Sequence, residues 1–203
     1  MATVQRVVLA SLFALIASHA LASGKPPDQQ IHEATDKLQS LIKQNHDRYK
    51  SNPQAFYKMV DAVVVPHFDQ KYIGQIVLGR NWRSASEQQR ARFVAAFKNS
   101  LVHSYADTLL ERYDTVQAIW KPVHLAPDAT ETTVNAELKR NDGPPIQLGF
   151  SVRKAGGGWK VYDVIVDGIS LAANFRSQFA AEVKQNGLDA LTQRLESCDK
   201  QLS

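Results

Sequence analysis

The sequence is poor in the residues that build covalent and metal-bound sites. It has one cysteine, Cys198, so an internal disulfide is excluded and the fold must depend on an apolar core. Because Cys198 lies near the end of the chain and far from any histidine in sequence, we interpret it as a tail thiol and not as a nucleophile. The six histidines show neither HxH nor HxxxH spacing, and no GxxxxGK[ST] pattern occurs. The sequence therefore indicates neither a metal site nor a P-loop nucleotide site.

Long apolar runs are also scarce, and the one near the start of the chain predicts export. Residues 7–17 are almost all apolar, but this run is shorter than the roughly 20 residues that a membrane-spanning helix needs. Arg6 precedes the run and Ala20-Leu21-Ala22 follows it, which is the order of a secretory signal peptide. We therefore predict a signal peptide over residues 1–22, cleavage near Ala22, and an exported chain without an anchor.

Excess charge of either sign is small. The formal net charge is +4 over 203 residues, which suits acidic surfaces but does not indicate nucleic acid. Residues 23–203 are long enough for one sizeable core, and no internal repeat or low-complexity tract divides them. We predict a single domain over 23–203, and a monomer.

The first part of this domain, residues 26–112, has the apolar spacing of helices. Helices are predicted over 28–50, from Pro53 to about Pro66, and over 70–78. Ser84 and Glu87 fit a capping box that opens the longest helix, which ends near Arg112. Its apolar stripe has a strict four-residue spacing, which drifts around a helix and predicts a curved contact face. The stripe consists of Phe93, Phe97, Leu101, Tyr105 and Leu109.

From residue 115 the apolar period changes to two, which is typical of strands. Four strands are predicted between residues 115 and 167, joined by turns at 141–143 and 155–158. Alternation of polar and apolar residues in the second and third strands indicates an antiparallel sheet with one buried face. C-terminal helices are predicted over 169–197, with a break at Gly187. The fold class is therefore α+β, with several helices covering a curved, antiparallel four-stranded sheet.

Aromatic residues concentrate on the longest helix, the third strand and the last helices. One interpretation is a filled core. The other is an open cone whose apolar cavity binds an apolar ligand. The pattern itself leaves both open.

Two blocks of residues carry a resemblance to a known family. The first contains LGRNWRSAS (78–86), QRARF (89–93), Phe97, Leu101 and Tyr105-Ala106. The second contains GWKVYDV (158–164), DGISL (167–171), NFR (174–176) and GLDAL (187–191). In their order and spacing these blocks resemble the MlaC family of phospholipid carriers, also called toluene-tolerance auxiliary proteins.

This resemblance implies a sheet related to the nuclear-transport-factor cone (NTF2-like), whose cavity takes phospholipid acyl tails. It implies a periplasmic carrier that shuttles phospholipids between an outer-membrane lipoprotein–porin complex and an inner-membrane ABC transporter with an MCE-domain ring. Such a carrier maintains the lipid asymmetry of the outer membrane. It has no catalytic activity and no cofactor, and phospholipid is its cargo.

Candidate binding residues follow from the resemblance together with the expected facing directions. The expected cavity lining is Phe97, Leu101, Tyr105, Leu148, Phe150, Val164, Val166, Ile169, Leu171, Phe175 and Phe179. Arg80, Arg83 and Arg90 gather near the start of the longest helix, where unpaired amides also favour anions, so they are candidates for the headgroup at the mouth. The alternative is that these arginines pack against Trp82 and pair with nearby acids.

Asp163 and Asp167 leave a second function open, because paired carboxylates can perform acid–base chemistry on related cones. The alternative function is thus an exported isomerase or lipid-modifying enzyme. Four strand residues span about 13 Å, however, which is too far for two carboxylates to act on one atom. Asp163 could instead bond a neighbouring element, and Asp167-Gly168 fits a turn. A third interpretation is an adaptor with a filled core.

Overall fold

A computed structural model describes residues 25–141 and 143–201. The predicted signal peptide, residues 1–22, lies outside this part of the chain. The described residues form helices and one antiparallel sheet, which confirms the α+β class. None of the helices in these ranges is both long enough and apolar enough to cross a membrane.

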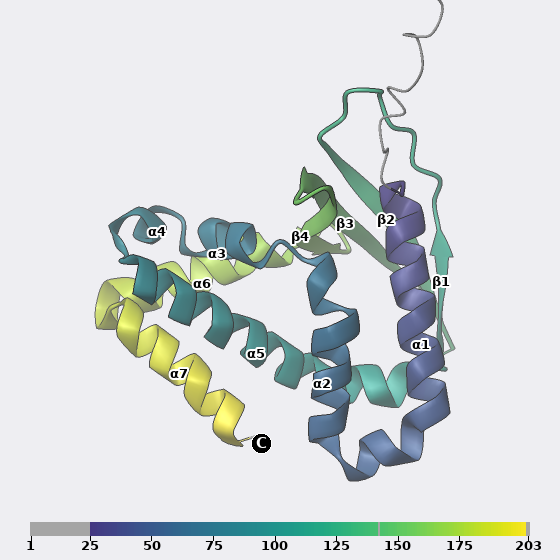
Figure 1. The fold of residues 1–203 in the computed structure, drawn as a ribbon, viewed down its shortest axis with the longest axis horizontal. Helices are drawn as coiled ribbons and strands as arrows, with labels where there is room; N and C mark the ends of the chain where they lie inside the picture. Colours follow the sequence, from purple (N-terminus) through teal and green to yellow (C-terminus); the bar gives the residue numbers. More distant parts are fainter. Residues whose placement is uncertain (1–24, 142, 202–203) are drawn as a thin grey trace, which may run out of the picture.

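The helices form two groups that the longest helix connects (Figure 1). On one side, α1 (Pro27–Ser51) and α2 (Pro53–Val63) run in opposite directions beside the sheet. The other group and its connection to α2 consist of η1 (Val65–His67), α3 (Gln70–Leu78), α4 (Arg80–Ser84), α6 (Leu171–Asn186) and α7 (Leu188–Gln201). The longest helix, α5 (Glu87–Arg112), contributes to both groups.

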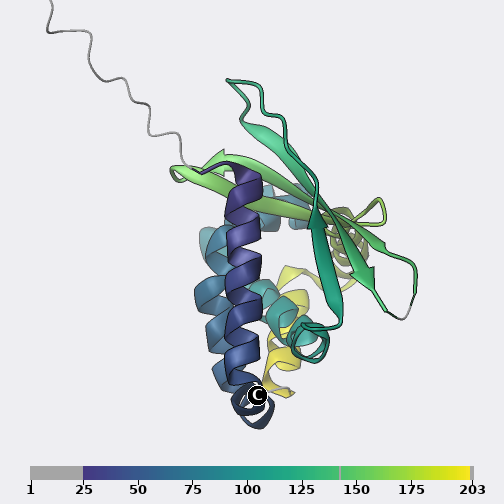
Figure 2. The same ribbon diagram turned by 90° about the vertical axis from the view of Figure 1, so that its right-hand side faces the viewer.

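The sheet has five strands and not the predicted four, arranged in chain order. They are β1 (Val116–Trp120), β2 (Glu131–Arg140), β3 (Ile146–Ala155), β4 (Gly158–Val166) and β5 (Ile169–Ser170), and all neighbours are antiparallel. Figure 2 shows the twisted sheet on one side of α1.

The extra strand, β5, follows a tight turn. Asp167 and Gly168 have φ values of 48° and 83°, which fold Ile169 back to pair with Val166. A two-residue strand is too short to show a period, so the sequence pattern did not reveal it. As a correction, α6 begins at Leu171 and not at Ile169, and α7 extends beyond residue 197 to Gln201.

The start of α5 also differs from the prediction. The capping box is formed by Ser86 and Gln89, and not by Ser84 and Glu87. The Gln89 amide donates to Ser86 Oγ over 3.1 Å, and the Ser86 amide donates to Gln89 Oε1 over 3.0 Å. Ser84 is the last residue of α4, a five-residue helix that is too short to be recognised from periodicity.

Two separate cores form along α5 because its apolar stripe drifts. Each four-residue step advances by about 40° around a helix of 3.6 residues per turn. Phe93 and Phe97 pack with α3, α6 and α7, whereas Ala106 and Leu110 pack with α1 and α2. Tyr105, which lies on α5 between Phe97 and Ala106, is 55% exposed. A third core lies between the start of α1 and the sheet, around Ile31, Val134, Val152, Trp159 and Val161.

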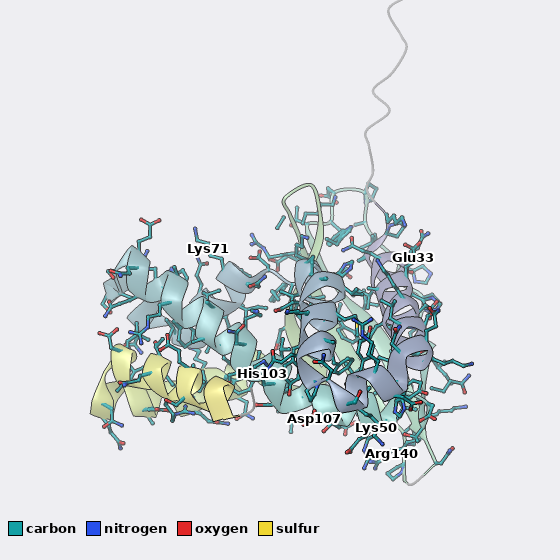
Figure 3. The ribbon with its side chains drawn as sticks, turned by 60° about the horizontal axis from the view of Figure 1, so that its bottom comes forward. Glu33, Lys50, Lys71, His103, Asp107 and Arg140 are labelled. Carbon is teal, nitrogen blue, oxygen red and sulfur yellow. The ribbon has the colours of Figure 1, made fainter. Side chains whose placement is uncertain are left out.

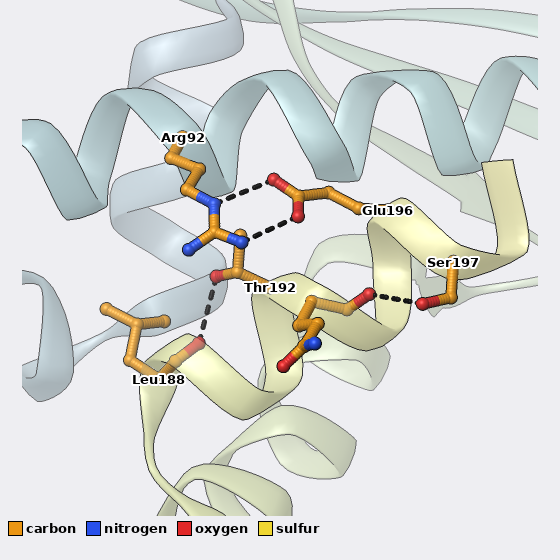
Figure 4. A network of polar contacts seen from close by, with 6 residues as sticks. Arg92, Leu188, Thr192, Glu196 and Ser197 are labelled. Carbon is orange, nitrogen blue, oxygen red and sulfur yellow. Dashed lines mark hydrogen bonds and ion pairs between the residues drawn. The ribbon is translucent and has the colours of Figure 1, made fainter. Parts of the chain in front are cut away.

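Polar contacts fix the helices to each other and to the sheet. In Figure 4, Glu196 of α7 accepts two hydrogen bonds from Arg92 of α5, at 2.7 and 2.6 Å. Asp69 accepts from the Tyr72 amide at the start of α3 and also from Arg153 Nη1 of β3, at 3.1 and 2.9 Å. Asp69, the N-cap residue of α3, therefore links this helix directly to the sheet.

Candidate functional site

An apolar pocket of about 770 Å³ lies between the helices and the sheet. Its walls come from α1, α5, the segment over residues 60–73, which runs from the end of α2 into α3, and parts of β1, β2 and β3. The helical lining includes Leu38, Ile42, Val60, Leu101, Val102 and Leu109. The volume falls in the range of about 300–1,000 Å³ that small-molecule sites occupy.

The sheet forms one wall of the pocket through a row of paired residues. Ala118 pairs with Leu138, and Leu138 pairs with Ile146 on the next strand. All three line the pocket, as does the neighbouring pair of Val116 and Arg140. Because side chains alternate between the two faces of a strand, these residues share the face that meets the helices.

The pocket has few charged residues, and all of them are basic. No carboxylate occurs among the described lining residues, which include Lys98, Arg112 and Arg140. Lys98 Nζ donates to Asp61 over 2.8 Å, and Arg140 Nε donates to the Pro144 carbonyl over 2.8 Å. A mainly apolar lining of this kind suits an apolar ligand.

A half-buried histidine, His67, lies between two residues of the pocket lining, Val65 and Phe68, without lining the pocket itself. Burial, followed by the nearby positive charges of Lys160 and Lys37, lowers the pKa of His67, which favours its neutral ring. The neutral ring can accept at Nδ1 a hydrogen bond from Gln30 Nε2, over 3.2 Å. The same Gln30 Nε2 donates to the Trp159 carbonyl over 2.8 Å, so these contacts join α1 to the sheet.

Three of the eleven predicted lining residues border this pocket: Phe97, Leu101 and Tyr105. All three lie on α5, where the predicted stripe passes between the two helical cores. The 55% exposure of Tyr105 indicates that the pocket opens to solvent on this side.

Four further predicted residues, Leu148, Phe150, Val164 and Val166, lie on the sheet next to the pocket but not among its lining residues. They share a face with Ile146, in the rows that follow it, because Leu148 pairs with Val166 and Phe150 pairs with Val164. Phe150 and Val164 pack against the third core. Lipid contact by these four remains a prediction.

The remaining four predicted residues lie near β5 and on α6. Ile169 is 62% exposed in β5, and Leu171 begins α6. Phe175 and Phe179 pack with Phe97 into an aromatic cluster, with ring centroids 5.1 and 5.6 Å from that of Phe97. This cluster is filled core, and none of these four residues lines the pocket.

The three predicted headgroup arginines lie away from the pocket. Arg90 donates to the Trp82 carbonyl over 2.8 Å, and its guanidinium lies 5.4 Å from the centre of the Trp82 ring. Arg80 and Arg83 are exposed on α4. Arg90 therefore packs against Trp82, as the alternative interpretation of these arginines expected. None of the three arginines borders the cavity.

The two aspartates of the enzymatic alternative are each bonded to the backbone. Asp163 accepts from the Ala172 amide at the start of α6, and Asp167 accepts from the Gln147 amide, both over 2.9 Å. Neither side chain lines the pocket.

The α1 and α2 side of the pocket was missed by the site prediction. Leu38, Ile42 and Val60 belong to regular apolar stripes, so a signal was present. A stripe shows that a face is covered but not which element covers it, so it could not distinguish pocket lining from core.

Comparison with known proteins supports one family. A sequence profile described as MlaC protein matches residues 32–197. The toluene tolerance protein ttg2D of Pseudomonas putida is 32% identical over 184 residues, covering 90% of this chain and 83% of that protein. The intermembrane phospholipid transport system binding protein MlaC of Haemophilus influenzae is 26% identical over 193 residues, covering 94% of this chain and 90% of that protein.

A solved structure agrees with the sequence matches. It is a phospholipid-binding protein from Ralstonia solanacearum in complex with a phospholipid, and it aligns with a TM-score of 0.78 and 31% identity. The alignment covers 88% of this chain and 99% of that chain. Together with the profile match over most of the sequence, these similarities confirm the predicted resemblance, and the chain belongs to the MlaC protein family.

Proposed function

We propose that this protein is a phospholipid carrier that holds acyl tails in the pocket between α1, α2, α5 and the sheet. The observation that carries the proposal is the apolar cavity of about 770 Å³ in a chain of the MlaC family. The similar solved protein, which is in complex with a phospholipid, supports the same ligand class.

The size of the pocket suits acyl chains. A water molecule occupies about 30 Å³ of liquid, and a methylene group is of similar size, so the pocket holds roughly 25 methylenes. Burying this many at about 0.8 kcal/mol each gives a gross stabilisation of about 20 kcal/mol relative to water. A membrane offers the tails a similar environment, so transfer between membrane and carrier is close to neutral, as a reversible handover requires.

The route of the lipid is part of the same proposal. We propose export to the periplasm after signal-peptide cleavage, and transfer between an outer-membrane lipoprotein complex and an inner-membrane ABC transporter, which maintains outer-membrane lipid asymmetry. The name of the Haemophilus influenzae relative, a binding protein of an intermembrane phospholipid transport system, supports this route.

The enzymatic alternative has weaker support. Its two candidate carboxylates, Asp163 and Asp167, each accept a backbone hydrogen bond outside the pocket. The relatives reported above carry the names of tolerance, binding and transport proteins. We therefore propose a carrier without catalytic residues or cofactor.

Placing a carboxylate in the pocket tests the proposal. Leu101→Glu on α5 and Ile146→Glu on the sheet should each lower the lipid taken up from phosphatidylglycerol vesicles by about tenfold or more, because burying an unpaired carboxylate among tails is costly. The matched control is Leu125→Glu, since Leu125 is 37% exposed and outside the pocket. Circular dichroism selects variants that fold. Wild-type occupancy in both folded pocket variants would overturn the proposed site.

A further inference from the structure

The two blocks of residues that carry the family resemblance meet at the junction of α3 and α4. Gly79 separates these helices with a φ of 53°, a backbone conformation that favours glycine. A Cβ at Gly79 would lie 2.9 Å from Nε and 3.2 Å from Cζ of Arg176, which belongs to α6. The missing side chain therefore lets the Arg176 guanidinium lie directly against this junction.

Two further arginines belong to α4 itself. Arg80 and Arg83 are three positions apart, which places them on the same side of a helix. Both are exposed, whereas Trp82 between them is buried. At the end of α4, a terminal nitrogen of Arg90 donates to the Arg83 carbonyl over 3.2 Å. This short helix thus carries two exposed arginines and is flanked by the guanidinium groups of two more.

The surrounding surface contains cations but no carboxylates. Residues 70–86, which include α3 and α4, and residues 171–181 of α6 contain no Asp or Glu. Lys71 adds a cation at the start of α3, and Figure 3 shows its side chain directed away from the helices. We define the basic surface as the exposed residues Lys71, Arg80, Arg83 and Arg176. Within residues 25–141 and 143–201, none of these four side chains forms an ion pair.

Acids on the neighbouring elements have other contacts. Asp69 accepts from Arg153 over 2.9 Å, and Asp189 accepts from Gln89 Nε2 over 3.0 Å. Glu87 lies in the first turn of α5, where the amides at a helix start favour a negative charge. The cations of the basic surface therefore repel each other without a carboxylate between them, and an anionic partner would relieve this repulsion.

The surroundings of the basic surface favour a membrane over a protein as this partner. The described residues include four exposed large apolar side chains, and none of them lies on α3, α4 or α6. The two described pockets include no residue of the basic surface, so no groove for a peptide lies there. Protein interfaces depend on apolar anchors in well-packed pockets, whereas an anionic membrane attracts clustered Lys and Arg through charge alone.

We infer that the basic surface docks this protein on anionic membranes by binding the phosphates of lipid headgroups. Guanidinium groups bind phosphate oxygens through paired, charge-assisted hydrogen bonds. Docking and lipid uptake use different residues, because no member of the basic surface lines the apolar pocket. The inference therefore goes beyond the proposed carrier function and can fail without it.

Co-sedimentation with vesicles tests the inference. Purified protein should sediment with vesicles of phosphatidylglycerol and phosphatidylcholine, but not with phosphatidylcholine alone, and added salt should release it. The variant Lys71→Gln/Arg80→Gln/Arg83→Gln should lower the partition coefficient about a hundredfold, because each cation near an anionic surface contributes about fivefold. Arg176 is kept, since its guanidinium packs against Gly79. Circular dichroism confirms that the variant folds.

A matched control removes the same charge from exposed positions of α1 and α2, as Lys43→Gln/Arg48→Gln/Lys58→Gln. It should lower the partition coefficient by less than about tenfold, because charges far from the membrane are screened. Equal losses in both variants would assign the attraction to net charge and overturn the inference. Wild-type binding by the variant of the basic surface would overturn it as well.

The same experiment separates membrane docking from lipid carrying. Lipid extracted from the protein in the supernatant reports the carrier function, and protein in the pellet reports docking. Wild-type protein that takes up lipid but never sediments with phosphatidylglycerol vesicles would contradict membrane docking alone. An acidic protein would then be the partner that fits the basic surface.

Discussion

At the residue scale, Arg90 illustrates how a cation beside a helix start can serve packing. Its Nε and one terminal nitrogen donate to the carbonyls of Trp82 and Arg83, over 2.8 and 3.2 Å. Its guanidinium also stacks near the Trp82 ring. These contacts hold α4 against the start of α5.

Replacing this arginine should therefore affect stability and not lipid binding. Arg90→Met should lower the free energy of unfolding by about 1–2 kcal/mol, since charge-assisted hydrogen bonds and a cation–π contact are lost. Urea denaturation measures this change, and lipid extraction should give wild-type occupancy. Lost occupancy with unchanged stability would instead make Arg90 part of the headgroup site.

At the residue scale, periodicity predicted which side chains of α5 share a face. Phe97, Leu101 and Tyr105 belong to one apolar stripe of α5, and all three border the pocket. Phe175 and Phe179 have the same aromatic character, but they pack into filled core. Sequence shows that a side chain is apolar, whereas the position of the opposing element decides whether it meets protein or empty space.

At the element scale, the start of α5 depends on the reciprocal hydrogen bonds of Ser86 and Gln89. Ser86→Ala should lower the free energy of unfolding by about 1 kcal/mol, because a helix-start amide loses its acceptor. Ser84→Ala is the matched control and should change the free energy of unfolding by less than about 0.5 kcal/mol. Ser84 is the last residue of α4, and its hydroxyl donates to the Asn81 carbonyl of the same helix. Thermal unfolding of both variants gives the comparison, and equal losses would contradict the cap assignment.

A second pair of elements, α6 and α7, gives a pH dependence. Hydrogen bonds from Arg194 to Glu182, at 2.8 and 2.7 Å, lower the pKa of Glu182. The folded-state pKa is thus below the unfolded one, so the pair stabilises the fold above the ordinary glutamate pKa and loses this effect as the pH falls through the lowered value.

The expected size is small because the pair is partly exposed, with side-chain exposures of 47% and 24%. Glu182→Gln should cost less than about 1 kcal/mol at pH 7 and should cost less at pH 3 than at pH 7. Urea unfolding of both proteins at the two pH values measures this difference. A constant difference between pH 7 and pH 3 would show that the ion pair is not its source.

Most elements were predictable from sequence, and the exceptions share a cause. Long helices and the four main strands show clear periods over many residues. The missed elements, α4 and β5, have five and two residues, so neither completes enough turns or alternations to be recognised. Their presence shifted the predicted cap and the predicted start of α6.

At the scale of the whole molecule, the pocket results from how α5 divides its contacts. The N-terminal half of α5 belongs to the core with α3, α6 and α7, and the C-terminal half belongs to the core with α1 and α2. The sheet closes one side of the space between the two cores, near β1, β2 and β3. The drift of the apolar stripe around α5 was predictable from sequence. The cavity was not, because it depends on where the two groups of helices lie relative to α5 and the sheet.

The most direct test of the central claim is native mass spectrometry of the protein, purified without detergent, followed by lipid extraction. We predict adducts of phospholipid mass that disappear on denaturation, because the apolar pocket should retain cargo taken from the cell. A bare mass that stays bare after incubation with phospholipid vesicles would contradict the account and favour an adaptor that binds no lipid.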